Sequence, residues 1–363
     1  MAKRIVAIYD RGIDKNLMQG FDVLEKYGYE LTLVEKTVNE DELAYQNSML
    51  SVEVNGPDGT PINEEVFQYL GDAEIIITHF APVSRRMIEA AKNLKIIATL
   101  RTGMENINME AAKERGIKVI NAPGRAAVAV ADFTVAAMLC EIRNIARTDE
   151  DIKTGGWTKK YPNRTYSDNM CNLKVGLVGF GDIGRKIATR LKGFGTTILA
   201  YDPYCTKESI EAFGCVPVSL DELLEQADFV SLHVRLSPQT QNMFGAAEFA
   251  KMKPTAIFVN AARAGLVDEA AMIDALEQKK IGGAVLDVFR EEPLPVDHPL
   301  RKLKNVTLSA HLAGTDIGTF SGSIKIVADN LEQYFSGGEL KNVVNHCPGK
   351  ERSCEKTKRI SGH

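Results

Sequence analysis

Short apolar runs alternate with stretches of helical periodicity over the first hundred residues. The apolar runs predict strands at Ile5–Tyr9, Glu30–Val34, Ile75–Thr78 and Lys95–Leu100. The stretches between them predict helices at Asn16–Tyr27 and Ser84–Asn93, and a dense turn signal at Asn55–Pro61. Continuous apolar strands separated by helices are typical of a parallel sheet that is covered on both faces.

A long segment without Pro or Gly, from Ala126 to Lys153, predicts one long helix that Gly155-Gly156 ends. A polar loop over Thr158–Asn172 separates it from a second alternating series. The strands predicted in that series are Val175–Phe180, Thr197–Tyr201, Phe229–Val234, Ala256–Asn260, Gly283–Val288 and Val306–Ser309. The helices predicted there are Asp182–Lys192, Leu220–Gln226 and Asp268–Gln278, followed by Thr319–Phe335. Six strands with this spacing are what a doubly wound dinucleotide-binding fold requires.

Length and composition limit the class of protein. The 363 residues are too many for one ordinary core and fit two domains. Hydrophobic residues make up 44% and charged residues 25%, and the net charge of −4 does not predict binding to nucleic acid or to an anionic membrane. No apolar run approaches the ~18 residues of a membrane span, and Ile5–Tyr9 is too short for a signal peptide. We therefore expect a cytoplasmic protein.

The cysteines and histidines do not predict a metal site. The six cysteines are scattered and form no C-x-x-C pair, so we expect reduced thiols. The six histidines are dispersed as well, and no His/Cys cluster has the spacing of zinc ligands.

A glycine-rich turn follows the first strand of the second series. Its glycines are Gly179, Gly181 and Gly184, in the pattern G-x-G-x-x-G between an apolar strand and an amphipathic helix. Gly179 permits the tight turn, Gly181 lets the backbone approach a pyrophosphate, and Gly184 lets the helix pack closely on the sheet. The free N–H groups of the helix N-terminus then face the phosphates. The pattern predicts a dinucleotide site.

The nucleotide expected at this site is NAD. The next strand ends at Asp202, 18 residues beyond Gly184, where a carboxylate accepts the ribose hydroxyls of NAD and repels the 2′-phosphate of NADP. Lys207 stands nearby and tempers this preference without reversing it.

Three polar residues follow strand ends further along the chain. Arg263, Glu292 and His311 come after three different strands, and ligands of open α/β sheets bind at that edge. A guanidinium can hold a substrate carboxylate by two hydrogen bonds, and an imidazole can move the hydroxyl proton at neutral pH. A carboxylate beside the imidazole orients it and favours its protonated form. Together they predict hydride transfer to a 2-oxo acid, or from the corresponding 2-hydroxy acid in the reverse direction.

The chain resembles the D-isomer-specific 2-hydroxyacid dehydrogenase family, which includes phosphoglycerate dehydrogenase and glyoxylate/hydroxypyruvate reductase. The resemblance extends from about Ile5 to Val344. The matching stretches are Val178–Gly184, His233–Thr240, Met252–Pro254, Val259–Asp268, Gly283–Phe289, Glu292–Pro295 and Ala310–Gly314. Several long motifs in this order are highly specific.

The resemblance implies roles for individual residues. Arg263, Glu292 and His311 match the family's catalytic residues, and Asp287 matches the aspartate that contacts the nicotinamide carboxamide. The residues that match positions lining the cofactor are Asp182, Ile183, Val234 and Ala261. The residues that match the substrate loop, where backbone amides meet the carboxylate, are Arg101, Thr102, Gly103 and Met104. The family also implies D stereochemistry, two domains with the site in their cleft, and homodimers.

The expected architecture is α/β with two domains. A flavodoxin-like substrate-binding domain covers residues 1–119 and 312–345, a Rossmann NAD-binding domain covers 120–311, and 346–363 form a disordered tail. The helix after Pro123 resembles the family's interdomain helix and dimer arm.

Three departures from the family pattern bear on the substrate. Arg101 stands where the family has Gly, Arg235 where it has Pro, and Ala264 where it has Gly. Arg101, Arg125 and Arg235 are therefore either ordinary arginines, solvated or ion-paired, or they bind a second anionic group on the substrate, a phosphate or another carboxylate. His79 either lines the cleft or is a satisfied loop histidine.

One alternative function stays open. The family contains NADH-sensing corepressors that bind proteins and catalyse little, and an intact Arg263, Glu292 and His311 does not exclude that role. The identity of the 2-hydroxy acid and the direction of the reaction are not readable from the residues.

Overall fold

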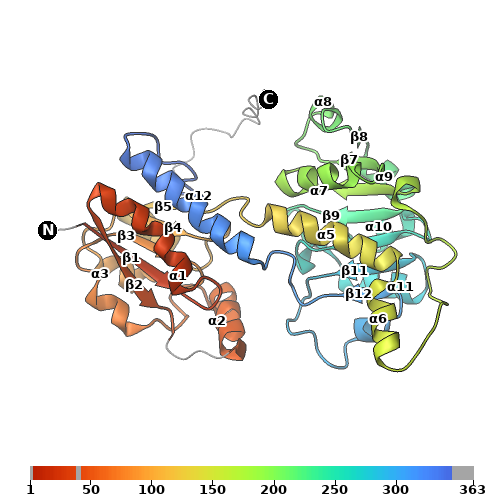
Figure 1. Ribbon diagram of the computed structural model, residues 1–363, viewed down its shortest axis with the longest axis horizontal. Helices are drawn as coiled ribbons and strands as arrows, with labels where there is room; N and C mark the ends of the chain where they lie inside the picture. The colour runs from red at the N-terminus through yellow and green to blue at the C-terminus, as the bar shows by residue number, and fades with distance from the viewer. Residues whose placement is uncertain (1–2, 38–41, 346–363) are drawn as a thin grey trace. The chain divides into compact units, whose positions relative to one another are not determined.

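The computed structural model of the protein describes residues 3–37 and 42–345, so the predicted tail lies outside the described residues (Figure 1). The chain divides into two compact units. Unit 1 runs to Arg125 and resumes at Asp316, and unit 2 spans Ala126–Thr315. No helix among the described residues has the length and apolar character needed to cross a lipid bilayer.

Unit 1 is built on a five-stranded parallel sheet. Its strands are β1 (Lys3–Tyr9), β2 (Tyr29–Glu35), β3 (Ala73–Thr78), β4 (Ile96–Thr99) and β5 (Lys118–Ile120). They pair in the order β2-β1-β3-β4-β5, which is the strand order of flavodoxin-like sheets. All four residues of β4 are buried, as expected of a strand with helices on both faces. The fold class predicted for this part of the chain is confirmed.

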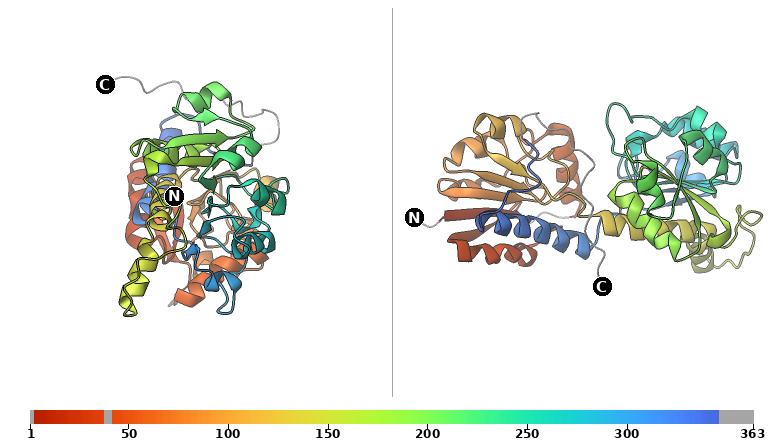
Figure 2. Two further views of the ribbon diagram at one scale, coloured as in Figure 1. Left: turned by 90° about the vertical axis from the view of Figure 1, so that its right-hand side faces the viewer. Right: turned by 90° about the horizontal axis from the view of Figure 1, so that it is seen from above.

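Helices cover both faces of this sheet. They are α1 (Lys15–Met18), the 3₁₀ helix η1 (Gln19–Tyr27), α2 (Glu42–Asn55), η2 (Glu64–Gln68), α3 (Arg85–Ala90), α4 (Met109–Glu114) and α12 (Ile317–Phe335). The helices η1 and α12 lie side by side on one face of the sheet (Figure 2). Phe21 of η1 and Leu331 of α12 belong to the core on that face. Met87 of α3 and Ala111 of α4 belong to the core on the other face.

The α-helix predicted over Asn16–Tyr27 is wrong in its geometry, because only α1 is α-helical and η1 continues as a 3₁₀ helix. Gly20 of η1 lies so close to α12 that a Cβ there would meet Ile324 at 2.6 Å. The tighter 3₁₀ helix therefore occurs where η1 packs closely against α12. This contact is with a distant segment of the chain, so the local sequence could not predict it.

Unit 2 is built on a seven-stranded parallel sheet in the order β12-β11-β10-β9-β6-β7-β8. The strands are β6 (Lys174–Val178), β7 (Thr197–Tyr201), β8 (Val216–Pro217), β9 (Phe229–Leu232), β10 (Ile257–Asn260), β11 (Gly283–Leu286) and β12 (Val306–Leu308). In sequence order this is 3-2-1-4-5-6 with one added strand, the doubly wound arrangement that the spacing predicted. The predicted Rossmann architecture is confirmed.

Helices again cover both faces. They are α5 (Ala127–Ile142), α6 (Ile145–Lys153), η3 (Met170–Asn172), α7 (Asp182–Lys192), α8 (Lys207–Glu211), α9 (Leu220–Gln226), α10 (Ala246–Lys251), η4 (Ala264–Leu266), α11 (Glu269–Glu277) and η5 (Pro299–Lys302). Met138 of α5 and Ile187 of α7 pack on one face. Leu223 of α9, Phe249 of α10 and Met272 of α11 pack on the other.

The single long helix predicted over Ala126–Lys153 is wrong, since it is interrupted at Asn144. This residue has φ 55°, in the left-handed region that Asn tolerates better than most residues. Its side chain donates to Asn163 Oδ1 at 2.7 Å and accepts from Arg147 at 3.1 Å. The sequence prediction looked for Pro or Gly as helix breakers. It therefore missed a break that depends on contacts of Asn144 with Asn163 and Arg147.

Candidate functional site

The glycine turn of unit 2 requires glycine at its first position. Gly179 has φ +98°, and a Cβ there would lie 2.6 Å from the His233 carbonyl oxygen and 3.0 Å from Val234 Cγ1. Its N–H donates to the Tyr201 carbonyl at 2.8 Å, which ties the turn to β7. The chain therefore leaves β6 in a tight turn beside the end of β9.

The helix after this turn begins without a side-chain cap. Gly181 is the N-cap of α7, no side chain accepts from the first turn, and a Cβ at Gly181 would have nothing within 4 Å. Gly184 has a different reason to be glycine, because a Cβ there would meet the Gly179 carbonyl oxygen at 2.5 Å. Asp182 is exposed and pairs with Lys186 at 3.3 Å. Uncapped first-turn N–H groups beside open space fit a pyrophosphate.

Asp202 links the end of β7 to the glycine turn. One oxygen of its carboxylate accepts the Phe180 N–H at 2.8 Å, and the other accepts the Tyr204 N–H at 2.8 Å. A carboxylate has about four acceptor positions, so each oxygen can still accept a hydroxyl. The residues present thus fit a dinucleotide with free ribose hydroxyls.

Other residues predicted to line the dinucleotide lie near this turn or at strand ends. Val234 is half-buried just beyond β9, within van der Waals distance of the Gly179 position. Ile183 is half-buried in the first turn of α7, and Ala261 is half-buried directly after β10.

His311 and Glu292 form a hydrogen-bonded pair beyond β12. The distance from His311 Nδ1 to Glu292 Oε2 is 2.8 Å, and Glu292 Oε1 accepts the Phe289 N–H at 2.9 Å. His311 has φ 54°, an unusual backbone conformation for a non-glycine residue that the surrounding loop must hold. The imidazole is 47% exposed and the carboxylate 28%. The pair is therefore preorganised and also accessible.

The pKa values of this pair move in opposite directions. The hydrogen bond to Glu292 raises the pKa of His311 above its usual value, although burial and the charge of Arg263 oppose it. Burial acts to raise the pKa of Glu292, but the hydrogen bonds from His311 and from the Phe289 N–H, together with nearby positive charge, outweigh it and lower that pKa. A protonated imidazole beside an ionised carboxylate is thus favoured.

Arg263 completes the group at the end of β10. Its side chain is exposed, its Nη1 donates to the Ala262 carbonyl at 2.7 Å, and its charge acts on both Glu292 and His311. The buried Asn260 clamps this segment, since its Oδ1 accepts the Ala262 N–H at 3.0 Å and its Nδ2 donates to the Arg263 carbonyl at 3.0 Å. Sequence reasoning missed Asn260, although an amide at the end of an apolar strand was a usable signal.

Asp287 holds the loop that carries His311. This fully buried carboxylate accepts from Ser309 Oγ at 2.7 Å, from the Leu312 N–H at 2.8 Å and from the Ala313 N–H at 2.9 Å. Among the described residues, the side chain of Asp287 contacts the 309–313 loop, and the contact with the nicotinamide carboxamide that the resemblance implies stays a prediction. Ser309 is the second positioning residue that sequence reasoning missed.

The predicted substrate loop lies in unit 1, after β4. Arg101 is buried with its guanidinium 4.1 Å from the centre of the Phe80 ring. Thr102 is exposed and its carbonyl accepts from Asn121 Nδ2 at 2.7 Å, while Gly103 and Met104 are partly exposed. Three arginines were predicted as candidates for binding a second anionic group on the substrate. Arg101 and Arg125 lie in unit 1, and Arg235 is exposed in unit 2.

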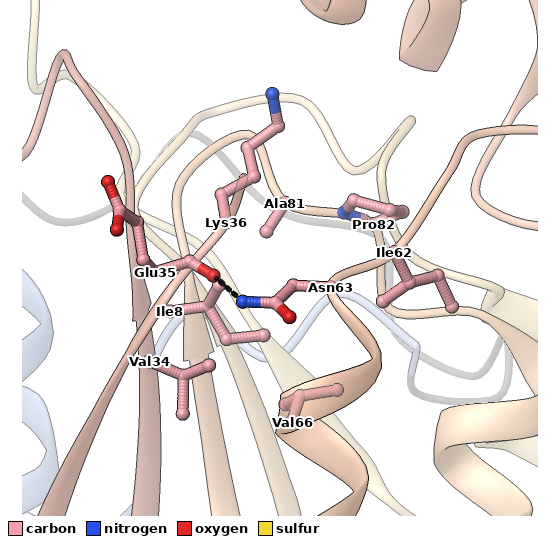
Figure 3. A pocket seen from close by; sticks show the side chains of 9 residues that line it. All are labelled: Ile8, Val34, Glu35, Lys36, Ile62, Asn63, Val66, Ala81 and Pro82. Atoms are coloured by element: carbon pink, nitrogen blue, oxygen red, sulfur yellow. Dashed lines mark hydrogen bonds between the residues drawn. The ribbon is translucent and has the colours of Figure 1, made fainter. Parts of the chain in front are cut away.

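A small hollow in unit 1 is not a substrate site. Nine side chains line it beside the end of β2, and Asn63 Nδ2 donates to the Glu35 carbonyl at 2.7 Å across it (Figure 3). Its volume of about 10 Å³ is close to the lower limit for one water molecule, so a 2-hydroxy acid does not fit.

Comparisons with known proteins point to one family. Residues 135–313 match the family model described as D-isomer specific 2-hydroxyacid dehydrogenase, NAD binding domain. The chain is 39% identical over 284 residues to D-3-phosphoglycerate dehydrogenase of Methanocaldococcus jannaschii, covering 78% of this chain and 53% of that one. It is 37% identical over 287 residues to glyoxylate reductase of Korarchaeum cryptofilum, covering 78% and 86%.

A solved structure has the same fold over nearly the whole chain. A protein from Thermus thermophilus superposes with a TM-score of 0.71 and 29% identity, covering 94% of this chain and 99% of that one. The chain spans about half the length of the first of the relatives above, the M. jannaschii enzyme. The NAD-binding domain predicted from the glycine turn is confirmed.

Proposed function

Because the chain belongs to the D-isomer specific 2-hydroxyacid dehydrogenase family, we propose that it uses NAD to interconvert a D-2-hydroxy acid and its 2-oxo acid. The observation that carries this proposal is the hydrogen bond between Glu292 and His311 at 2.8 Å, with Arg263 placed after the end of β10 and its charge acting on both residues. The relatives named as phosphoglycerate dehydrogenase and glyoxylate reductase support the same class of substrate. No finding favours the corepressor alternative.

The residues around the glycine turn hold the cofactor, which supplies or accepts the hydride when it is bound. First-turn N–H groups of α7, next to Gly181, bind the pyrophosphate. Asp202 accepts the ribose hydroxyls and disfavours a 2′-phosphate, which supports NAD over NADP. Asp182, Ile183, Val234 and Ala261 line the nucleotide. Asp287 positions the His311 loop and, as the resemblance implies, would contact the nicotinamide carboxamide.

Arg263, His311 and Glu292 divide the chemistry between them. Arg263 binds the substrate carboxylate through its guanidinium. Glu292 accepts a hydrogen bond from the N–H at His311 Nδ1, so Nε2 is the imidazole nitrogen left to exchange a proton with the substrate oxygen. In reduction the protonated His311 donates that proton, and in oxidation the neutral imidazole removes it. In unit 1, backbone amides of Arg101–Met104 contribute to carboxylate binding.

Large apolar side chains are exposed on and just after α6. Ile145, Ile152 and Trp157 are among them, which supports a homodimer packed through this region. Light scattering tests it, and a monomer at micromolar concentration contradicts it. The exposed free thiol of Cys171 supports a reducing, cytoplasmic location, which cell fractionation checks.

The test of the reaction is NADH oxidation against a panel of 2-oxo acids: hydroxypyruvate, phosphohydroxypyruvate, glyoxylate and 2-oxoglutarate. We expect turnover of at least one of them and its loss in His311→Ala. His298→Ala is the control, because it removes another imidazole of unit 2 that caps η5. A His311→Ala protein with parental turnover refutes the mechanism.

A further inference from the structure

Ionisable residues also gather at the carboxyl edge of the unit 1 sheet. Asp10 directly follows β1, His79 directly follows β3, and Arg101 follows β4 by two residues, while Arg125 ends the segment after β5. The strands β1, β3, β4 and β5 are neighbours in this sheet (Figure 1). Ligands of open parallel α/β sheets bind outside this edge. The cluster lies entirely within unit 1 and includes none of the residues proposed above to transfer the proton.

Asp10 and His79 form a buried pair. Both Asp10 oxygens lie 3.1 Å from His79 Nδ1, and the side chains are 0% and 1% exposed. Asp10 also accepts the N–H groups of Gly12 at 2.9 Å, Ile13 at 3.0 Å and Phe80 at 3.1 Å. Because it can only accept, an ionised Asp10 requires the proton of His79 on Nδ1.

This arrangement leaves His79 Nε2 as a buried acceptor. Nε2 has no hydrogen-bond partner within the described part of the chain. Burial lowers the pKa of His79 despite the charge of Asp10, so the neutral imidazole with a lone pair on Nε2 is favoured. The rings of Phe80 and Phe320 lie 4.5 and 5.7 Å from the imidazole. A buried nitrogen without a hydrogen-bond partner is destabilising, and a ligand hydroxyl that donates to it would remove that penalty.

Arg125 brings a second unsatisfied group to the cluster. Its Nη1 is buried and lacks a hydrogen-bond partner among the described residues. Burial, followed by the charge of Arg101, lowers the pKa of Arg125 to about 10. The Arg101 guanidinium lies 4.1 Å from the centre of the Phe80 ring, which itself lies 4.5 Å from the imidazole of His79, and the charges of both Arg125 and Arg101 act on His79. A partly buried guanidinium with a second cation beside it is stabilised by an oxyanion.

We propose that His79 and Arg125, with Arg101 beside them, form a binding site for an oxyanion that also presents an O–H group. Arg125 donates to the anionic oxygens, and His79 Nε2 accepts the hydroxyl hydrogen. Hydrogen phosphate, a phosphate monoester and a hydroxylated carboxylate have this chemistry. Sulfate has the charge without the O–H at neutral pH, so the site discriminates against it. The oxyanion arrives either as a second group on the 2-oxo acid or as a free ligand.

The binding test uses the full chain with ¹³C-labelled histidine and follows the imidazole resonances by NMR. His79→Gln assigns the His79 signal among the six histidines. Titration with inorganic phosphate is expected to shift that signal saturably, and sulfate to bind about tenfold or more weakly, because its contact leaves Nε2 unsatisfied. No saturable shift with phosphate, or equal affinity for sulfate, overturns the proposal.

Arg125 variants test the anion contact. Arg125→Gln is expected to weaken phosphate binding by about tenfold or more, since it removes a charged hydrogen bond. Arg125→Lys keeps the charge without the planar fork and is expected to bind phosphate more weakly than the parent, so it replaces the Gln variant if that does not fold. Arg86→Gln is the control, because this exposed guanidinium pairs with Glu64. Parental affinity in a folded Arg125 variant refutes the assignment.

A kinetic arm, which rests on the proposed function, separates the two sources of the oxyanion. If the group belongs to the substrate, Arg125→Gln raises KM for phosphohydroxypyruvate or 2-oxoglutarate about tenfold and changes KM for glyoxylate by less than about twofold. If phosphate binding is lost while every KM is unchanged, the site holds a free ligand. A protein that binds phosphate at His79 and turns over no 2-oxo acid refutes the proposed function and leaves the site standing.

Discussion

Replacing Glu292 by Gln removes the charge that His311 faces across 2.8 Å and keeps the size of the side chain. The hydrogen bond to Glu292 is the largest cause that raises the pKa of His311, so this pKa falls in Glu292→Gln. Reduction requires protonated His311 and declines as pH rises through its pKa. The decline therefore moves to lower pH in the variant. Oxidation requires the neutral imidazole, so its rise with pH also moves to lower pH.

The size of the effect follows from the geometry of the pair. A hydrogen bond between charged groups contributes about 1.5–3 kcal/mol. The imidazole is 47% exposed and the carboxylate 28%, so solvent screens the pair. We therefore expect a loss of about 1–2 kcal/mol of transition-state stabilisation, or about 5–30-fold in kcat/KM for reduction near neutral pH.

The assay follows NADH absorbance in both directions across neutral pH. Glu291→Gln is the matched control, because this neighbouring glutamate is exposed and lies outside the His311 pair. Its pH profile should coincide with that of the parent. If the Glu292→Gln profile also coincides with the parent's, Glu292 does not set the protonation of His311 and the reasoning fails.

Three other substitutions test the surroundings of the site. Asp202→Asn should keep an acceptor for the glycine turn and raise kcat/KM with NADPH relative to NADH by about tenfold or more, because the carboxylate no longer repels the 2′-phosphate; an unchanged ratio contradicts the assignment. Asp287→Asn should lose at least one of three hydrogen bonds to the His311 loop, lowering kcat and lowering stability in urea by about 1.5–3 kcal/mol; parental values of both contradict it. Arg147→Leu should leave the buried carboxylate of Glu141, which accepts hydrogen bonds from Arg147 at 2.8 and 2.9 Å, without its cation. We expect it to lower the free energy of unfolding in urea by about 3–5 kcal/mol. Adding Glu141→Met should recover most of that loss, and no recovery would show that the pair is not the cause.

Local signals predicted most of the strands that build both sheets. Apolar runs such as Thr197–Tyr201 are short, bounded by turns and buried on both faces, so they form strands in the places expected. Elements with weak local patterns were missed, among them α2, α4, α8, β5 and β8. Lys118–Ile120 and Val216–Pro217 are too short to show a period, and they become strands by pairing with β4 and β7.

Packing between distant segments decided where helices break. Asn144 ends α5 because its left-handed backbone is held by Asn163 and Arg147. The spacing of these residues along the chain does not predict that they contact Asn144. The absence of Pro and Gly was therefore a poor guide to continuity.

The sequence by itself determined the family and the dinucleotide turn, and it led to the prediction that Arg263, Glu292 and His311 act together. Those inferences depend on short motifs whose residues act through local geometry, as Gly179 does at φ +98°. Only the tertiary structure decided how the side chains are held and which of them remain unsatisfied. Asp287 organises the His311 loop, and Asp10 orients His79, through contacts between residues 22 or more positions apart. Such partners are chosen by strand order and burial, which no local pattern encodes.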